Sequence, residues 1–232
     1  MIDLSVLNDC LVQTDQKIIM LVVDGLGGIA NKDTKKTELE TAHTPNLDQL
    51  ASTSSCGLSV PVLPGITPGS GPGHLALFGY DPFKHFIGRG VLEALGIGVP
   101  IESGDVLARG NFCTVDDDGA LIDRRAKRIP SEFSEPLCKK LDSIKVANVD
   151  ITVHPVKDYR FVLQMKGNSL SSEVSETDPQ KIGLRPLLVK PLTNEATITA
   201  SAINEFVCQA NGVLSSEKLA NMILLRGFAK LP

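Results

Sequence analysis

The residues best suited to chemistry lie in a loop rich in glycine and proline, residues 65–74, which presents the hydroxyl of Ser70 just before an apolar run. Glycines let the backbone approach a ligand closely, and a helix starting here would offer unpaired N–H groups to an anion. This arrangement suits a nucleophilic serine beside a phosphate group. The alternative is an ordinary Gly/Pro surface turn.

A candidate metal ligand, Asp24, lies upstream of this loop. Residues 17–23 read Lys-Ile-Ile-Met-Leu-Val-Val, a run apolar on both faces that predicts a buried parallel strand. Open α/β sheets bind ligands beyond the carboxyl ends of their strands, and a carboxylate there suits a divalent cation. Asp24 directly follows the run, although an Asx turn or a helix N-cap is the alternative.

A cluster of positive charge spans residues 123–128, which include Arg124, Arg125 and Arg128. Guanidinium groups match the oxygens of carboxylates and phosphates, so this cluster can hold a small substrate with two or three negative charges. Asp123 can orient an arginine or accept a substrate hydroxyl. The alternative is a solvated basic face.

Single polar residues extend the candidate site. Arg109, Arg160 and Arg226 each adjoin a predicted strand, so each either points into a cleft or flanks the sheet. His74 follows Ser70 by four residues, one helical turn, and can act as a proton donor or contact a phosphate. A histidine packed near the sheet is the alternative.

The elements that would position these residues predict an α/β fold: a mainly parallel sheet with helices on both faces, interrupted by a smaller α/β domain. Residues 1–98 form the first part of the main domain, residues 99–193 the insert, and residues 194–232 the return. Expected helices cover 45–51, 131–141 and 196–210, and expected strands cover 17–23, 57–62, 106–115, 120–123, 149–153, 160–166 and 222–225.

Composition excludes several classes of protein. A net charge of −4 argues against a general nucleic-acid binder. The five cysteines show no C-x-x-C spacing, so we expect reduced, mostly buried thiols rather than a disulfide framework or a zinc site. No leader and no apolar run of about 18 residues is evident, so we expect a cytoplasmic protein without a membrane partner.

Ordered sequence strings across nearly the whole chain carry a family resemblance. They are Asp24-Gly25, residues 44–48, Gly69-Ser70, residues 77–82, 88–90, 104–106, 109–112, 123–126, 177–179 and 225–227. On these strings the chain resembles the cofactor-independent phosphoglycerate mutases of the archaeal type, which belong to the alkaline-phosphatase-like superfamily. That family interconverts 2-phosphoglycerate and 3-phosphoglycerate through a phosphoserine.

The resemblance implies roles for named residues. Ser70 matches the nucleophile and Asp24 a metal-binding aspartate, and Asp123, Arg124, Arg125 and Arg128 fall in the segment that grips the glycerate. It also implies two divalent cations, Mn²⁺ first, with Mg²⁺, Co²⁺ or Zn²⁺ as alternatives, and Ser70 as a second metal ligand.

One departure concerns length. Members of the family are longer, and their remaining metal ligands lie in a carboxyl-terminal half that this sequence lacks. We therefore expect that half to come from a longer chain and the present chain to be inactive, or nearly so, alone. The alternatives are another metal-dependent phosphatase, phosphodiesterase or phosphonate-acting enzyme of the superfamily, and a non-catalytic module that binds a phosphorylated metabolite or a partner.

Overall fold

The computed structural model describes residues 10–23, 25–66, 68–85 and 87–232. The chain divides into two compact units, Met1–Val60 and Pro61–Pro232, and each is described by itself.

The described part of the first unit contains two helices, α1 (Glu38–Thr41) and α2 (Pro45–Thr53). Helix α1 begins with a capping box, because the Thr37 hydroxyl accepts from the Glu40 N–H and the Glu40 carboxylate accepts from the Thr37 N–H. Helix α2 begins with a proline, as the sequence predicts, because proline needs no partner for a missing N–H.

The predicted strands at 17–23 and 57–62 are wrong. Residues 17–23 form no helix or strand, and Ile18 and Ile19 are 95% and 92% exposed. A strand needs a neighbour to pair its backbone N–H and C=O groups, and the described residues of this unit include no strand.

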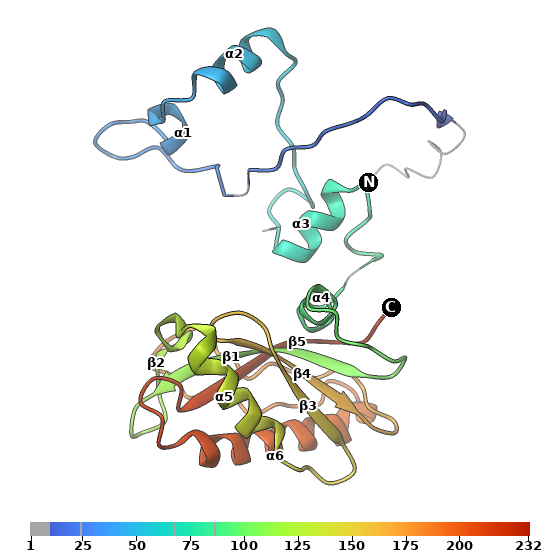
Figure 1. The fold of residues 1–232 in the computed structure, drawn as a ribbon, viewed down its shortest axis with the longest axis vertical. Coiled ribbons are helices and arrows are strands. Elements are labelled where there is room, and N and C mark those ends of the chain that lie inside the picture. The colour runs from blue at the N-terminus through green and yellow to red at the C-terminus, as the bar shows by residue number, and fades with distance from the viewer. Residues whose placement is uncertain (1–9, 24, 67, 86) are drawn as a thin grey trace. The chain divides into compact units, whose positions relative to one another are not determined.

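The second unit contains a five-stranded sheet. Its strands are β1 (Val106–Val115), β2 (Leu121–Asp123), β3 (Asp150–Pro155), β4 (Arg160–Lys166) and β5 (Met222–Ala229). The order is β2-β1-β4-β3, with β5 pairing with β1, and every pair is antiparallel (Figure 1). The α/β class is confirmed, but the expected parallel sheet rested on residues 17–23 and 57–62, which form no strand.

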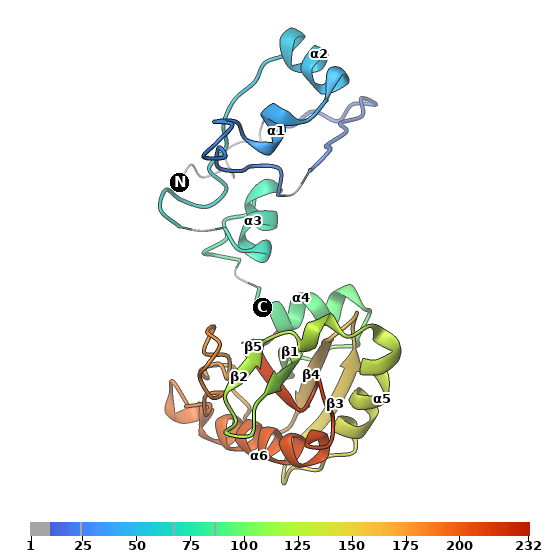
Figure 2. The same ribbon diagram turned by 90° about the vertical axis from the view of Figure 1, so that its left-hand side faces the viewer.

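Helices cover both faces of this sheet. They are α4 (Arg89–Gly96), α5 (Ser131–Asp142) and α6 (Thr197–Leu214). The unit also contains α3 (Ser70–Leu77) and the short 3-10 helices η2 (Ala126–Arg128) and η3 (Asn194–Ala196). Helices α5 and α6 pack on one face around Phe112, Phe161 and Phe206, and α4 packs on the other against Leu107 (Figure 2).

The expected helices and strands between residues 106 and 225 are confirmed, with small shifts at their ends. The strands expected at 106–115 and 120–123 pair as a hairpin, β1 with β2. Strand β5 pairs with β1, so the segment that we assigned to the return lies in the same sheet as the predicted insert. The domain boundaries themselves stay predictions.

Two further sequence expectations can be compared with the described residues. Cys113 and Cys138 are buried but Cys10, Cys56 and Cys208 are exposed, so the expectation of mostly buried thiols is wrong. Across the described residues, no helix has both the length and the apolar character that a membrane span requires.

Candidate functional site

One face of the sheet carries a group of arginines. Side chains alternate along a strand, so Arg109 and Asn111 of β1 lie on the same face as Leu107, which α4 covers. Arg226 of β5 lies opposite Arg109, and Arg160 of β4 lies opposite Asn111, so all four side chains share this face.

Helix α4 supplies a carboxylate to this face. A Cβ on Gly90 would lie 2.4 Å from the carbonyl oxygen of Leu107, so only glycine lets α4 approach β1 so closely. Oε1 of Glu93 then lies 3.4 Å from Nε of Arg109 and 3.4 Å from Nη1 of Arg160. The contact to Arg109 is ionic without hydrogen-bond geometry, since Nε of Arg109 has no hydrogen-bond partner.

The arginines on this face carry more positive charge than the carboxylate beside them neutralises. Burial lowers the pKa of Arg109, the charge of Glu93 opposes that effect, and the charges of Arg226 and Arg160 lower it further. Burial and the charge of Arg89 likewise lower the pKa of Arg226. Nε of Arg226, like Nε of Arg109, is a buried N–H donor without a hydrogen-bond partner among the described residues, whereas Oδ1 of Asn111 and Oε2 of Glu93 are buried acceptors without one. The two unpaired guanidinium donors, beside the excess of arginines, favour an additional anion at this face.

A second carboxylate, Asp178, links two of the arginines. Its side chain is 1% exposed, and its two oxygens accept hydrogen bonds from Nε and Nη2 of Arg124 at 3.0 and 2.6 Å. Nη1 of Arg226 lies 3.7 Å away. Burial alone would raise the pKa of Asp178, but the hydrogen bonds from Arg124 and the N–H of Gln180, with the charges of both arginines, lower it.

The edge of β5 holds Asp178 in place. The N–H of Thr177 donates to the carbonyl of Leu225 at 3.0 Å, and the N–H of Leu225 donates to the Thr177 hydroxyl at 2.7 Å. The N–H of Gly227 donates to Glu176 at 2.9 Å. These bonds satisfy the open edge of the strand and fix the segment that carries Asp178.

The predicted cluster at 123–128 forms a tight turn after β2. Oδ1 of Asp123 accepts from the N–H of Arg125 at 2.8 Å, and Oδ2 accepts from the N–H of Lys127 at 2.7 Å. Ala126, Lys127 and Arg128 all have positive φ, at 46°, 51° and 56°. Arg125, Lys127 and Arg128 are exposed.

The serine loop leads into α3, which begins at Ser70, inside the loop, whereas the sequence predicts a helix that starts just after the loop. His74 lies one turn later on the same helix and is exposed. Arg89, the first residue of α4, lies near this loop, since a Cβ on Gly69 would be 3.6 Å from its Nη2. The side chain of Ser70 and the whole of Asp24 lie outside the described residues.

The described residues do not form a metal site. In the part of the chain that the structure describes, no three His, Cys, Asp or Glu side chains come together in a way that could hold a metal ion. The predicted ligands Asp24 and Ser70 are not among the described side chains, so the described part provides no test of them.

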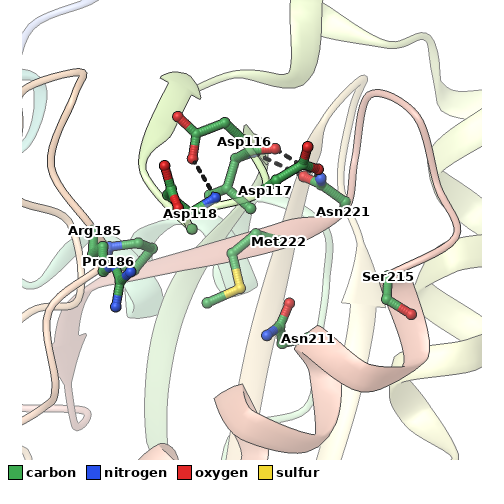
Figure 3. Close-up of a pocket in the computed structure, with 11 residues that line it drawn as sticks. Asp116, Asp117, Asp118, Arg185, Pro186, Asn211, Ser215, Asn221 and Met222 are labelled. Atoms are coloured by element: carbon green, nitrogen blue, oxygen red, sulfur yellow. Dashed lines mark hydrogen bonds between the residues drawn. The ribbon is translucent and has the colours of Figure 1, made fainter.

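A cavity of about 490 Å³ lies elsewhere, at the turn between β1 and β2 (Figure 3). Asp116, Asp118, Arg185, Asn211 and Met222 line it. Oδ1 of Asp116 is already occupied by the N–H groups of Asp118 and Ala120. None of the predicted site residues reaches this cavity, so it does not belong to the arginine site.

The structure thus joins some predicted residues and separates others. Arg124 and Arg226 both contact the carboxylate of Asp178, whereas Arg160 contacts Glu93 of α4. Sequence reasoning gave no role to Glu93 or Asp178. Glu93 is the single acidic residue of α4, a signal that could have identified it.

Comparison with known proteins points to one family over most of the chain. The family model described as 2,3-bisphosphoglycerate-independent phosphoglycerate mutase matches residues 51–220. A probable 2,3-bisphosphoglycerate-independent phosphoglycerate mutase of Thermus thermophilus is 44% identical over 229 residues, covering 98% of this chain and 56% of the relative. One of Thermotoga neapolitana is 48% identical over 220 residues, covering 94% of this chain and 54% of the relative.

Solved structures give a similar result. The cofactor-independent phosphoglycerate mutase from Thermoplasma acidophilum matches with a TM-score of 0.59 and 32% identity, over 91% of this chain and 59% of that one. A protein of Pyrococcus horikoshii matches with a TM-score of 0.64 and 27% identity, over 89% and 49%. The chain spans about half the length of the curated relatives it matches.

Proposed function

The chain belongs to the 2,3-bisphosphoglycerate-independent phosphoglycerate mutase family, and we propose that it takes part in interconverting 2-phosphoglycerate and 3-phosphoglycerate through a phosphoserine at Ser70. Because the chain spans about half of its relatives' length, the activity is proposed for a protein of the relatives' full length. The chain contributes the serine loop and the arginine-bearing unit.

The observation that carries this proposal is the excess of guanidinium groups around one sheet face and the adjoining turn. Arg109, Arg160 and Arg226 share the face, and the exposed Arg125 and Arg128 lie on the turn. A phosphoglycerate carries a carboxylate and a phosphate on three carbons, and guanidinium forks match the oxygens of both groups.

The arginines have a defined task in the proposed reaction. Oγ of Ser70 forms a bond to phosphorus while the bond from phosphorus to the ester oxygen of the substrate breaks, and the serine proton passes to that oxygen. The other hydroxyl of the glycerate then attacks the phosphoserine and returns a proton to Ser70. The task of the arginines is to retain the glycerate between the two transfers. This retention makes the enzyme a mutase rather than a phosphatase.

We further propose that the reaction depends on two divalent cations, with Mn²⁺ the first candidate. Metal ions beside the serine would supply electrostatic stabilisation of the phosphoryl oxygens. Asp24 and Ser70 are the proposed ligands from this chain. Since the described residues provide no group of three ligands, the other ligands are proposed to come from outside the described part.

The test joins this chain to the part of the Thermus thermophilus relative that lies beyond the matched region. We expect the fusion, supplied with Mn²⁺, to convert 3-phosphoglycerate into 2-phosphoglycerate in a ³¹P NMR assay. We also expect mass spectrometry to locate a phosphoryl group on Ser70. The Ser70→Ala fusion is the matched control and should lose both signals.

Two outcomes would replace the proposal. A folded fusion that hydrolyses phosphate esters, with Arg125→Met leaving hydrolysis unchanged and no transfer between glycerate positions, would indicate a phosphatase of the superfamily. A folded fusion that never acquires phosphate on Ser70 would indicate a binding module.

A further inference from the structure

The turn at residues 123–129 has an unusual backbone. Ala126, Lys127 and Arg128 are three consecutive residues with φ between 46° and 56°, the left-handed region. Residues with a Cβ disfavour this region because the Cβ crowds the following carbonyl oxygen. Such a conformation persists only when surrounding contacts determine it, and it is found most often at functional sites.

Asp123 makes the contacts that span the turn. Its two carboxylate oxygens accept from the N–H groups of Arg125 and Lys127, at 2.8 and 2.7 Å. The N–H of Arg128 also donates to the carbonyl of Arg125 at 2.7 Å. Each carboxylate oxygen of Asp123 thus accepts from a backbone N–H of the turn, so Asp123 holds the backbone of the turn.

Two anchors tie the turn to the rest of the unit. Ala126 is completely buried in the main core, and Ile129 is 8% exposed. Arg124 makes two hydrogen bonds to Asp178, whose side chain is 1% exposed. The Arg124 side chain therefore binds another residue of the protein, Asp178, although the family resemblance grouped Arg124 with the residues that grip the substrate.

The side chains that remain available are cationic. Arg125, Lys127 and Arg128 are exposed, and none of the three forms an ion pair with any residue that the structure describes. The turn therefore concentrates three positive charges that lack carboxylate partners within the described residues.

We propose that Asp123 and Asp178 are positioning residues that preform this turn, so that Arg125, Lys127 and Arg128 bind the carboxylate or phosphate of a phosphoglycerate. The inference rests on the proposed function for its ligand. Neither aspartate contacts the ligand. Asp123 fixes the backbone of the turn, and Asp178 fixes its start through Arg124. Holding the three cations in place before binding reduces the entropy that the complex would otherwise lose.

The test uses glycine to relieve the strain that Asp123 is proposed to hold. Lys127→Gly and its matched control Lys127→Ala remove the same charge, but only glycine adopts positive φ without penalty. Binding of 3-phosphoglycerate to the full chain is measured by titration calorimetry. We expect Asp123→Ala to weaken binding about tenfold in the Lys127→Ala background and about threefold or less in the Lys127→Gly background, as preorganisation predicts.

Two binding outcomes would overturn the inference. If Asp123→Ala weakens binding equally in both backgrounds, Asp123 acts on the ligand directly rather than through the turn. If it has no effect in either background, the turn does not depend on Asp123.

A ligand-free measurement separates this inference from the proposed function. If neither this chain nor its fusion with the Thermus thermophilus part binds 3-phosphoglycerate, the proposed substrate is wrong, but thermal unfolding still tests the turn. We expect Asp123→Ala to lower the midpoint more in the Lys127→Ala background than in the Lys127→Gly background. Equal shifts in both backgrounds contradict the positioning role.

Discussion

Apolar side chains are exposed in the described part of Met1–Val60 and buried in the sheet of the second unit. In the first, Leu11, Ile19 and Leu58 are 74%, 92% and 105% exposed. In the second, Phe112 and Phe161 are fully buried, with ring centroids 5.1 Å apart. Both stretches contain apolar runs, so apolar composition alone does not decide burial.

The difference lies in the partners that each stretch has. Strand β1 is paired by β4 and β5 and covered by helices on both faces, all within the described residues. Residues 17–23 have the same apolar character, but the described residues of their own unit place no strand beside them. An apolar run thus indicates that its side chains need to be buried. Whether they are buried depends on whether other residues supply neighbouring strands and covering helices.

The largest effect that could break this comparison concerns the cysteines. Burial and the charges of Glu135 and Asp142 raise the pKa of Cys138 to about 12. At neutral pH its thiolate fraction is therefore about a thousandfold smaller than that of a thiol with the ordinary pKa of 9.0. Cys10 and Cys56 are exposed. In labelling with a thiol-specific disulfide reagent, we expect both to react at least a thousandfold faster than Cys138. Equal rates for Cys56 and Cys138 would mean that the first unit buries its side chains in solution.

A pair of truncations measures the same contrast as stability. Phe161→Ala removes a buried ring from the main core and should lower the free energy of unfolding by about 3–5 kcal/mol. Leu21→Ala removes a side chain that is 79% exposed and should change it by less than about 0.5 kcal/mol. Urea unfolding monitored by circular dichroism compares the two, and a large cost for Leu21→Ala would show that residue 21 is packed.

Asp178→Asn tests the polar part of the second unit. The change weakens the pairing with Arg124 and Arg226 and should cost about 2 kcal/mol, below the value for a fully buried pair because Arg124 is 29% exposed. The folded-state pKa of Asp178 is lowered, so its stabilisation is present above the ordinary pKa of 3.8 and is lost as the pH falls through the folded-state value.

The cost of Asp178→Asn should therefore be largest above about pH 5 and shrink below about pH 4. Urea unfolding across this pH range measures it, with Asp117→Asn on the exposed hairpin turn as the control. A pH-independent cost would contradict the charge pairing.

The smallest effect concerns the other edge of the sheet. Oδ1 of Asp142 accepts from the N–H of Val153 on the outer strand β3 at 2.8 Å. Asp142→Ala leaves that N–H without its partner and should cost about 1 kcal/mol. Amide hydrogen exchange of Val153 should accelerate while that of Leu163 on β4 stays unchanged, and an unchanged rate at Val153 would contradict the edge contact.

Much of the second unit could be predicted from local patterns. The hairpin around Gly119, the strand at 160–166 and the helix at 131–141 each depend on residues close in sequence. The antiparallel pairing of β5 with β1 could not be predicted, because it joins residues more than 100 positions apart. The parallel strand at 17–23 failed because its pattern says nothing about where its neighbours come from.

The candidate site, too, could be predicted from the sequence only in part. Residue types located the cluster at 123–128, because three arginines in six residues stand out in the sequence. They could not indicate that Arg124 is held by Asp178, which lies 54 positions away, or that Glu93 of α4 reaches Arg109 and Arg160. Such partners are set by packing and register, which single residues do not reveal.

The central claim is that the cationic turn after β2 receives the phosphoglycerate. An amide NMR titration of the full chain with 3-phosphoglycerate tests it most directly, with Arg125→Met/Arg128→Met as the test variant and Arg185→Met, an exposed arginine that lines the cavity at Asp116 and Asp118, as the control. We predict saturable shifts centred on Lys127 and Arg128, lost in the test variant and kept in the control. Shifts centred on the cavity at Asp116 and Asp118, or no shifts at all, would contradict the claim.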